Sequence, residues 1–346
     1  MKRTILFFCI AMICFSCKKE YQPRTIDTVH IQKYTIEKTS IRAINAIDEN
    51  TVYYAGSNGD IGKTTDGGKT WNKQQIIFQD SIKPHFRSIA TNGKVQFALS
   101  IANPALLYQV TDGNPKLVYQ EKGEKVFYDA MTFLDAKNGI AIGDPIDGCT
   151  SIIITRDGGN SWNKIPCDKL PEVKEGEASF AASNTNIATF KNTIWVVTGG
   201  TKARVLKSND KGETWTIIET PIIQGDGPQG IYSVDFHDEN NGIIMGGDFS
   251  KPEENKANKA ITVDGGLTWE LVANGESPNY KSCVQYIPGT QGKEVIAVGK
   301  TGVSFSNDAG KTWKDISKEP YYAIQFVNSN TAWLSGAQRM GKLQLK

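Results

Sequence analysis

The chain has 346 residues, with 39 lysines and arginines against 37 aspartates and glutamates and 39% hydrophobic residues. This length can bury a sizeable core, and the composition is that of a folded protein, not of a disordered or membrane-embedded one. The nearly balanced charge shows no excess of basic residues of the kind that nucleic-acid-binding proteins have, so we expect no nucleic-acid partner. Removal of Lys2 and Arg3, which lie in the leader described next, leaves 37 basic residues against 37 acidic ones.

The first residues have the order of an export signal. Lys2 and Arg3 precede an apolar run over 5–15, and Ser16 and Cys17 follow it. The run is too short to span a bilayer as a stable helix. Its end resembles the lipobox of bacterial lipoproteins, although Cys14 stands where leucine is usual. We predict a signal peptide over 1–16 and lipidation of Cys17; the alternative is a plain signal peptide that contains cysteines.

Residues 17–29 are polar and lack periodicity, which predicts a lipid-anchored tether. Lys18 is not the aspartate that the resemblance to lipoproteins would require for retention in the inner membrane. We therefore expect an exported lipoprotein of the outer membrane, on a face that the sequence leaves open. No other run approaches the roughly 20 apolar residues of a membrane-spanning helix, so the lipid alone is expected to hold the protein at the membrane.

One eight-residue motif recurs through the rest of the chain. Five copies begin with Thr or Ser, carry Asp at the third position and Gly at the fifth, and end on Trp. Their Asp and Trp residues are Asp66 and Trp71, Asp157 and Trp162, Asp210 and Trp215, Asp264 and Trp269, and Asp308 and Trp313. A degenerate sixth copy has Asp112, with Leu117 in the Trp position. Spacings of 44 to 54 residues between the aspartates, with four short apolar runs in each period, are typical of propeller blades.

The motif resembles the Asp-box, also called the bacterial neuraminidase repeat. We expect a hairpin turn in which the Asp carboxylate accepts backbone N–H groups and the fifth-position Gly takes a positive φ. The Trp is expected to wedge between adjacent blades. Six equivalent copies indicate a structural role for these aspartates, not a catalytic one.

The fold predicted for 30–346 is all-β, a seven-bladed β-propeller of four-stranded antiparallel blades. Each period supplies strands a to d from the axis outward, and the last blade lacks its outer strand. Residues 30–37 alternate apolar and polar, so this N-terminal strand is expected to fill the gap and close the ring. The predicted first residues of strand a are Ile41, Phe86, Tyr128, Ser179, Ile231, Tyr280 and Tyr322.

The face opposite the aspartate turns is the predicted site. Long loops over 168–178, 221–230 and 247–259 are expected on this face. Loops carried by a rigid ring often form the binding site of a protein. The first residues of strand a and nearby loop carboxylates should rim the channel. The ligand-binding candidates are Arg42, Arg87, Tyr128, Asp144, Glu177, Asp226, Tyr232, Asp248, Lys281 and Tyr322. They could bind an anionic sugar, a peptide or a partner loop, or pair with one another in a solvated channel.

Over about 35–346 the repeats resemble the photosystem II stability and assembly factor-like propellers. The resemblance implies a non-enzymatic binding or assembly platform for an envelope protein or a glycan, built as a monomeric propeller. It rests on the repeat chemistry, with Arg42 and Arg87 near the starts of their strands as a weaker sign.

The alternative is a glycan-active enzyme. Sialidases also carry Asp-boxes, and they use three arginines, a Tyr paired with Glu, and an Asp. The candidates here are Arg42, Arg87, Arg204, Tyr232, Glu177 and Asp144. A lyase acting on uronate polymers is a further possibility. The catalytic residues stay unknown at this point, and we favour the non-enzymatic function.

Neither a cofactor nor a metal is expected. No dinucleotide-binding glycine motif precedes a helix, and His30, His85 and His237 are scattered. Cys149 and Cys167 flank the hairpin of the third blade. If residues 155 and 161 pair across its turn, the two cysteines are directly opposed, so we predict a structural disulfide between them. Cys283 is expected to be a buried small hydrophobe.

Overall fold

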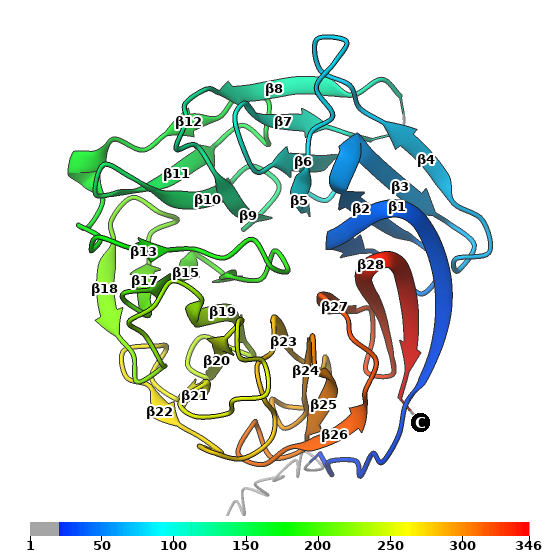
Figure 1. The fold of residues 1–346 in the computed structure, drawn as a ribbon, viewed down its shortest axis with the longest axis vertical. Helices are drawn as coiled ribbons and strands as arrows, with labels where there is room; N and C mark the ends of the chain where they lie inside the picture. The colour runs from blue at the N-terminus through cyan, green and yellow to red at the C-terminus, as the bar shows by residue number, and fades with distance from the viewer. Residues whose placement is uncertain (1–20, 112, 346) are drawn as a thin grey trace, which may run out of the picture.

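The computed structural model describes residues 21–111 and 113–345, which form a ring of antiparallel sheets around a central channel (Figure 1). Four sheets have four strands each. They are formed by β5 (Phe86–Thr91), β6 (Gln96–Ser100), β7 (Ala105–Gln109) and β8 (Lys116–Glu121); β9 (Tyr128–Phe133), β10 (Gly139–Ile146), β11 (Cys149–Thr155) and β12 (Asn163–Lys164); β14 (Ile187–Phe190), β15 (Thr193–Val197), β17 (Arg204–Ser208) and β18 (Thr216–Glu219); and β23 (Cys283–Tyr286), β24 (Val295–Gly299), β25 (Gly302–Ser306) and β26 (Lys314–Ser317).

Two further sheets have six strands each. In order across each sheet, they contain β27 (Ala323–Phe326), β28 (Thr331–Gln344), β1 (His30–Ala46), β2 (Val52–Gly56), β3 (Asp60–Thr64) and β4 (Asn72–Gln75); and β13 (Glu177–Ala178), β16 (Gly199–Gly200), β19 (Gln229–Phe236), β20 (Gly242–Asp248), β21 (Lys259–Thr262) and β22 (Glu270–Leu271). Two single-turn 3₁₀ segments, η1 (Ser57–Gly59) and η2 (Cys167–Lys169), lie in connections.

The predicted number of seven separate blades is wrong, because the hydrogen bonds of the described strands join them into six sheets. The reason lies in β1, a single strand of 17 residues. Residues 30–35 of β1 pair with β28, and after a register shift residues 41–46 pair with β2. The last and first blades are thus joined in one sheet, and the N-terminal strand closes the ring.

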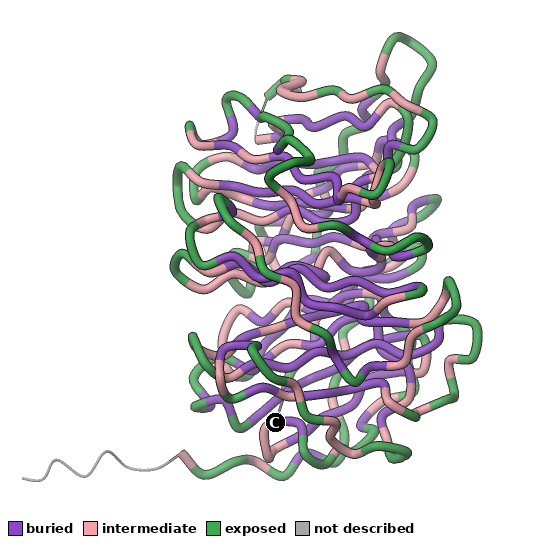
Figure 2. Tube along the Cα trace, turned by 90° about the vertical axis from the view of Figure 1, so that its left-hand side faces the viewer, coloured by how far each residue is buried: buried purple, intermediate pink, exposed green. Residues whose placement is uncertain are grey.

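The core consists of apolar clusters between neighbouring sheets. In one cluster Ala43 and Ile61 of the first sheet pack against Phe86 and Leu106 of the next. Strands that are apolar on both faces suit this position, because each sheet is covered by two neighbours. Figure 2 shows the result: buried chain runs through the wall of the ring, and exposed loops lie at its edges.

The repeated turns have the predicted geometry. In the first, the Asp66 carboxylate accepts the Thr70 amide at 2.9 Å and the Thr70 hydroxyl at 2.6 Å, and Gly68 has φ +87°. The four other full copies repeat the amide bond and the positive φ of the fifth-position glycine. Trp71 contacts both Tyr34 and Trp333, so it packs against the neighbouring strands as expected. Asp112, in the degenerate copy, lies outside the described residues.

Residues 21–29 lie along the ring, in contrast to the free tether predicted for 17–29. Ile26 is buried in the cluster between β23–β26 and β28, and Arg24 pairs with Glu294. The signal peptide and Cys17 lie outside the described residues. Within the part of the chain that the structure describes, no helix is long and apolar enough to cross a membrane.

Candidate binding site

Residues 179–186 cross the central channel instead of starting an inner strand. The sequence predicts strand a from Ser179, but the inner strand of this sheet, β14, begins at Ile187. The Asn184 side chain accepts the Met131 amide at 2.9 Å and donates to the Ile89 carbonyl at 3.0 Å. The Ser183 hydroxyl donates to the Ser282 carbonyl at 2.6 Å. The crossing segment is therefore tied to three different sheets.

This segment separates two cavities. Its first part, 179–182, lines a cavity of about 370 Å³ at the end of the channel where the inner strands begin. Its second part, 183–185, lines a cavity of about 460 Å³ at the other end. We call them the mouth cavity and the lower cavity. The mouth cavity lies on the face predicted to carry the site, opposite the aspartate turns.

Two arginines enter the mouth cavity from neighbouring inner strands. The Arg42 side chain, from β1, donates to the Ala182 carbonyl at 3.3 Å and lies 4.1 Å over the ring of Tyr322. Arg87, from β5, donates to the Ala181 carbonyl at 2.9 Å. Among the described residues, neither arginine forms an ion pair. Burial, with the charge of Arg42 beside it, lowers the pKa of Arg87 to about 10, so the Arg87 guanidinium group is still charged at neutral pH.

Two carboxyl groups lie beside these arginines. Asp129 is completely buried, and neither of its oxygens has a hydrogen-bond partner. Burial and the nearby Asp144 raise the pKa of Asp129 well above its usual range, although Arg87 opposes the shift. The Asp144 carboxylate accepts the Ser179 amide at 2.9 Å, and burial also raises its pKa. The cavity therefore holds two guanidinium groups next to two buried carboxyl groups whose pKa values are raised.

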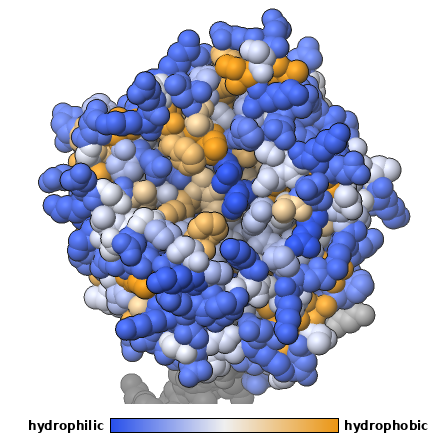
Figure 3. All heavy atoms as spheres, in the orientation of Figure 1, coloured by the Kyte–Doolittle hydropathy of each residue, from blue (hydrophilic) through white to orange (hydrophobic). Residues whose placement is uncertain are grey.

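An aromatic wall forms one side of the mouth cavity. Phe180 stacks on Tyr232 with ring centroids 3.9 Å apart, and Tyr280 meets Tyr232 edge-on at 4.8 Å. Phe249 continues the wall to the surface, where it is 49% exposed. Figure 3 shows apolar and hydrophilic residues meeting around the centre of this face. The cavity thus offers guanidinium groups and aromatic surface side by side.

Five of the ten predicted ligand-binding residues come together here. Arg42, Arg87, Asp144 and Tyr232 line the mouth cavity, and Tyr322 lies under Arg42.

The other five do not face the mouth cavity. The buried Tyr128 side chain points into the wall of the ring. There its hydroxyl donates a hydrogen bond to the Glu121 carboxylate of the neighbouring sheet at 2.6 Å. Lys281 is also buried, and its ammonium donates to Thr301 at 2.9 Å. Asp248 accepts the amide and the hydroxyl of Ser250 in a turn.

Glu177 and Asp226 are displaced for different reasons. Glu177 is buried in β13, where Arg204 donates to it through Nε at 3.1 Å. This ion pair removes both residues from the sialidase-like set predicted above. The Tyr232 hydroxyl of that set donates to the Pro228 carbonyl at 2.7 Å and is not paired with a glutamate. Asp226 lies exposed in the loop before β19.

Sequence reasoning missed Asp129, Phe180 and Phe249, and it named Tyr280 only as the start of a strand and not as a ligand-binding candidate. A signal for Asp129 was present: Arg42, Arg87 and Asp129 each follow a fully buried apolar or aromatic residue near the start of an inner strand. Alternation along the strand then turns the second side chain toward the channel. Phe180 and Phe249 belong to connections, whose paths no periodicity reveals.

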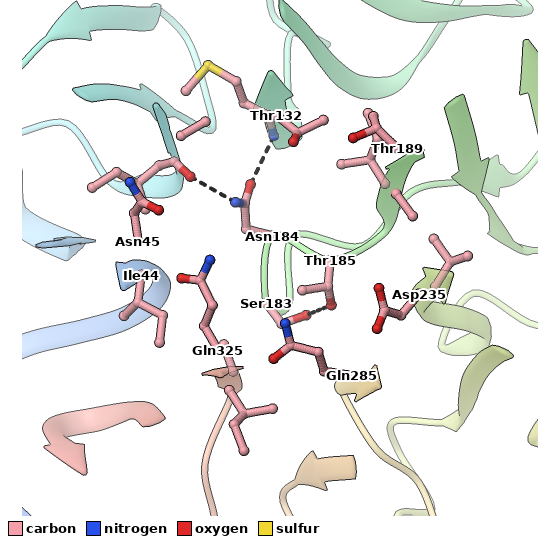
Figure 4. Close-up of a pocket in the computed structure, with 18 of the residues that line it drawn as sticks. Ile44, Asn45, Thr132, Ser183, Asn184, Thr185, Thr189, Asp235, Gln285 and Gln325 are labelled. Atoms are coloured by element: carbon pink, nitrogen blue, oxygen red, sulfur yellow. Dashed lines mark hydrogen bonds between the residues drawn. The ribbon is translucent and has the colours of Figure 1, made fainter. Parts of the chain in front are cut away.

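The lower cavity is polar, and its side chains join neighbouring sheets (Figure 4). Gln325 accepts the Ala46 amide at 2.7 Å, and Gln285 accepts the Phe326 amide at 2.9 Å. Asp235 accepts the Tyr286 amide at 2.6 Å. Each contact reaches from one inner strand to the next. These groups therefore have a structural role: they join the inner strands of neighbouring sheets.

Cys149, Cys167 and Cys283 are free thiols in the structure. The thiols of Cys149 and Cys167 nevertheless interact, because burial and the hydrogen bond to Cys167 raise the pKa of Cys149 to about 12. The disulfide between them stays a prediction. The register across the hairpin differs from the predicted one. Ile153 pairs with Lys164, one residue away from the predicted pairing, so Cys149 is not directly opposite Cys167. Cys167 also begins η2 instead of continuing β12. Cys283 is buried, as predicted.

Among residues 21–111 and 113–345, no group of three or more His, Cys, Asp or Glu side chains could hold a metal ion.

The chain is similar in sequence to one characterised assembly protein. No protein-family model matches it. The photosystem II assembly lipoprotein Ycf48 of Synechococcus sp. (strain CC9902) is 23% identical over 270 residues, which cover 67% of this chain and 75% of that protein.

Solved structures match over nearly the whole chain. The structure of YCF48 bound to D1 peptide has a TM-score of 0.65 at 15% identity, and the match covers 93% of this chain and 100% of that one. YCF48 from Cyanidioschyzon merolae has a TM-score of 0.62 at 16% identity over 90% and 98%. The WD40 repeats of RRP9 have a TM-score of 0.63 at 12% identity over 94% and 100%. These likenesses establish the β-propeller fold.

Proposed function

We propose that this protein is a non-enzymatic binding platform that holds a segment of a protein partner in the mouth cavity. The observation that carries the proposal is the presence, in one cavity, of two arginines that form no ion pair with any described residue and of an aromatic wall that ends at exposed Phe249. Guanidinium groups recognise carboxylates, and aromatic rings supply apolar contact area. The similarity to Ycf48, and the structure of YCF48 bound to D1 peptide, support a protein partner over a glycan.

Geometry favours this function over the glycan-active enzyme. A sialidase-like reaction would need the arginines, Tyr232 and a glutamate around one substrate. Arg204 and Glu177 instead form a buried ion pair away from Arg42 and Arg87. Four residues of that set line the mouth cavity, but the third arginine and the glutamate do not, so the catalytic set is incomplete there.

The proposal includes an anchor at the membrane. The motif at Cys17 supports a lipoprotein exported to the outer membrane, and the related Ycf48 is itself described as a lipoprotein. Lipidation would leave the mouth cavity free for the partner.

The test places a photo-crosslinking benzoylphenylalanine at Phe249 in the intact protein, in its native envelope. The expected result is a covalent adduct with one protein, identified by mass spectrometry. Arg42→Ala combined with Arg87→Ala should reduce the adduct at least about 10-fold, because a hydrogen bond to a charged group contributes about 1.5 to 3 kcal/mol. Arg156→Ala, which breaks an exposed pair with Glu213 on the opposite face, is the matched control and should leave the adduct unchanged.

An adduct that persists in the double arginine variant would count against recognition by the mouth cavity. Loss of binding in Arg156→Ala would instead indicate a partner on the other face. Turnover of a sialylated or uronate-containing reporter glycan by the purified protein would overturn the non-enzymatic function.

A further inference from the structure

The segment that joins the ring to Cys17 is bound tightly to the face with the aspartate turns. Arg24 donates through Nε to Glu294 at 2.9 Å and through Nη1 to Asn330 at 2.7 Å. The Glu294 side chain is fully buried. The Asn307 side chain donates to the Arg24 carbonyl at 2.9 Å. Figure 1 shows this segment, in dark blue, beside β26 at the lower edge of the ring.

The last described residue of the segment is Tyr21. Its hydroxyl donates to Glu294 at 2.5 Å, and its amide donates to the Gln291 side chain at 3.4 Å. Only four residue steps separate Tyr21 from Cys17 in the sequence. A fully extended chain spans at most about 3.6 Å per residue, so four residue steps reach at most about 14 Å. A lipid on Cys17 would therefore hold this face of the ring close to the bilayer.

The surface beside this exit point carries exposed apolar side chains and lysines, with one acidic residue, Asp238, among them. Val263 and Leu267, in the turn between β21 and β22, are 72% and 60% exposed. Val263 shares a cavity of about 250 Å³ with Gln291, Lys293 and Lys311, so the turn adjoins the residue that Tyr21 contacts. Both lysines are exposed.

Apolar side chains flanked by lysines suit the interface between lipid tails and anionic headgroups. We propose that the turn over 262–268, with Lys293 and Lys311, is a membrane-contact surface. The occupant is the lipid bilayer in which the Cys17 anchor is inserted. The docked segment then sets the orientation of the ring: the aspartate turns face the membrane and the mouth cavity points away from it. The inference rests on the proposed lipid anchor, and it goes beyond that anchor by assigning an orientation.

The test uses the full lipidated protein in phosphatidylethanolamine and phosphatidylglycerol vesicles, with and without bromine on the acyl chains. A Val263→Trp variant reports contact with the tails, because bromine quenches indole fluorescence only at short range. The matched control is Ile77→Trp, in the loop between β4 and β5 on the face of the mouth cavity, where Ile77 is 48% exposed. Both positions are exposed, so neither change disturbs the core.

The expected result is that brominated lipid lowers the fluorescence added by Val263→Trp at least 2-fold and leaves that added by Ile77→Trp unchanged. Adding Glu294→Gln and Arg24→Ala to Val263→Trp should release the segment and reduce the quenching, while flotation with vesicles persists. If the protein floats with the vesicles but bromine quenches both tryptophans equally, the proposed orientation is wrong and the lipid anchor remains supported. Failure of the protein to float with vesicles would overturn both the anchor and the inference.

Discussion

The Asn184 side chain accepts the Met131 amide across the central channel, at 2.9 Å. Asn184 has φ +63°, a left-handed conformation that asparagine tolerates better than most residues. Its amide also donates to the Ile89 carbonyl, so one side chain joins the crossing segment to two inner strands. These contacts hold the crossing segment that separates the mouth cavity from the lower cavity.

Asn184→Ala should therefore destabilise the ring by about 1 to 3 kcal/mol, the usual cost of leaving buried polar groups without partners. Urea unfolding followed by tryptophan fluorescence measures the change. Asn184→Asp is a useful comparison, because it keeps the acceptor for Met131 and loses the donor to Ile89. An alanine variant as stable as the parent would show that the crossing segment is held by other contacts.

The Glu177 and Arg204 pair predicts a large and asymmetric effect on stability. Their side chains are 0% and 5% exposed. Glu177→Ala should cost about 3 to 5 kcal/mol, because it removes the buried counter-charge of Arg204 and leaves only the exposed Glu219, at 3.8 Å. The double change Glu177→Leu and Arg204→Met should restore most of that loss, because it removes both charges.

Thermal and urea unfolding of the three proteins would measure these differences. Glu213→Ala, which breaks the exposed pair with Arg156, is the control and should cost less than about 1 kcal/mol. If Glu177→Ala unfolded like the parent, the pair would have no structural role, and its place in a catalytic set would need reconsideration.

Asp235 predicts a dependence of stability on pH. Burial raises its pKa to about 7, although the amides of Tyr286 and Phe236 oppose the shift. An unfolded aspartate has a pKa of about 3.9. Between these values the folded protein binds a proton that the unfolded chain does not, so the free energy of unfolding falls as pH rises from about 4 through about 7. The loss is on the order of 1 to 4 kcal/mol, because the carboxyl group faces a cavity and is partly exposed.

Asp235→Asn keeps an oxygen to accept the Tyr286 amide and removes the titration. This variant should lose less stability than the parent between pH 5 and pH 8, as measured by urea unfolding at each pH. Parallel curves for the two proteins would contradict the shifted pKa.

Local and periodic features of this protein could be predicted from its sequence. The aspartate turns depend on residues at most four positions apart, so their hydrogen bonds and positive glycine φ angles follow from the motif. Strand starts at Phe86 and Tyr128 follow from alternation along short strands. Arg42 and Arg87 were found because both stand at the same place in such strands.

Features that depend on contacts distant in sequence could not be predicted in this way. The joining of the first and last blades needs the register of β1 against β28. The position of Cys149 relative to Cys167 needs the register across a hairpin, which differs by one residue from the predicted pairing. A small difference in register turns a side chain to the other face or past its partner.

The sequence by itself determined a repetitive all-β ring and the two arginines of its mouth, because both depend on local periodicity. Only the tertiary structure decided how many sheets form, that 179–186 cross the channel, and that Arg24 binds Glu294 to hold the N-terminal segment on one face. These contacts join residues tens to hundreds of positions apart. Their free energies depend on burial and mutual geometry, which exist only in the folded ring.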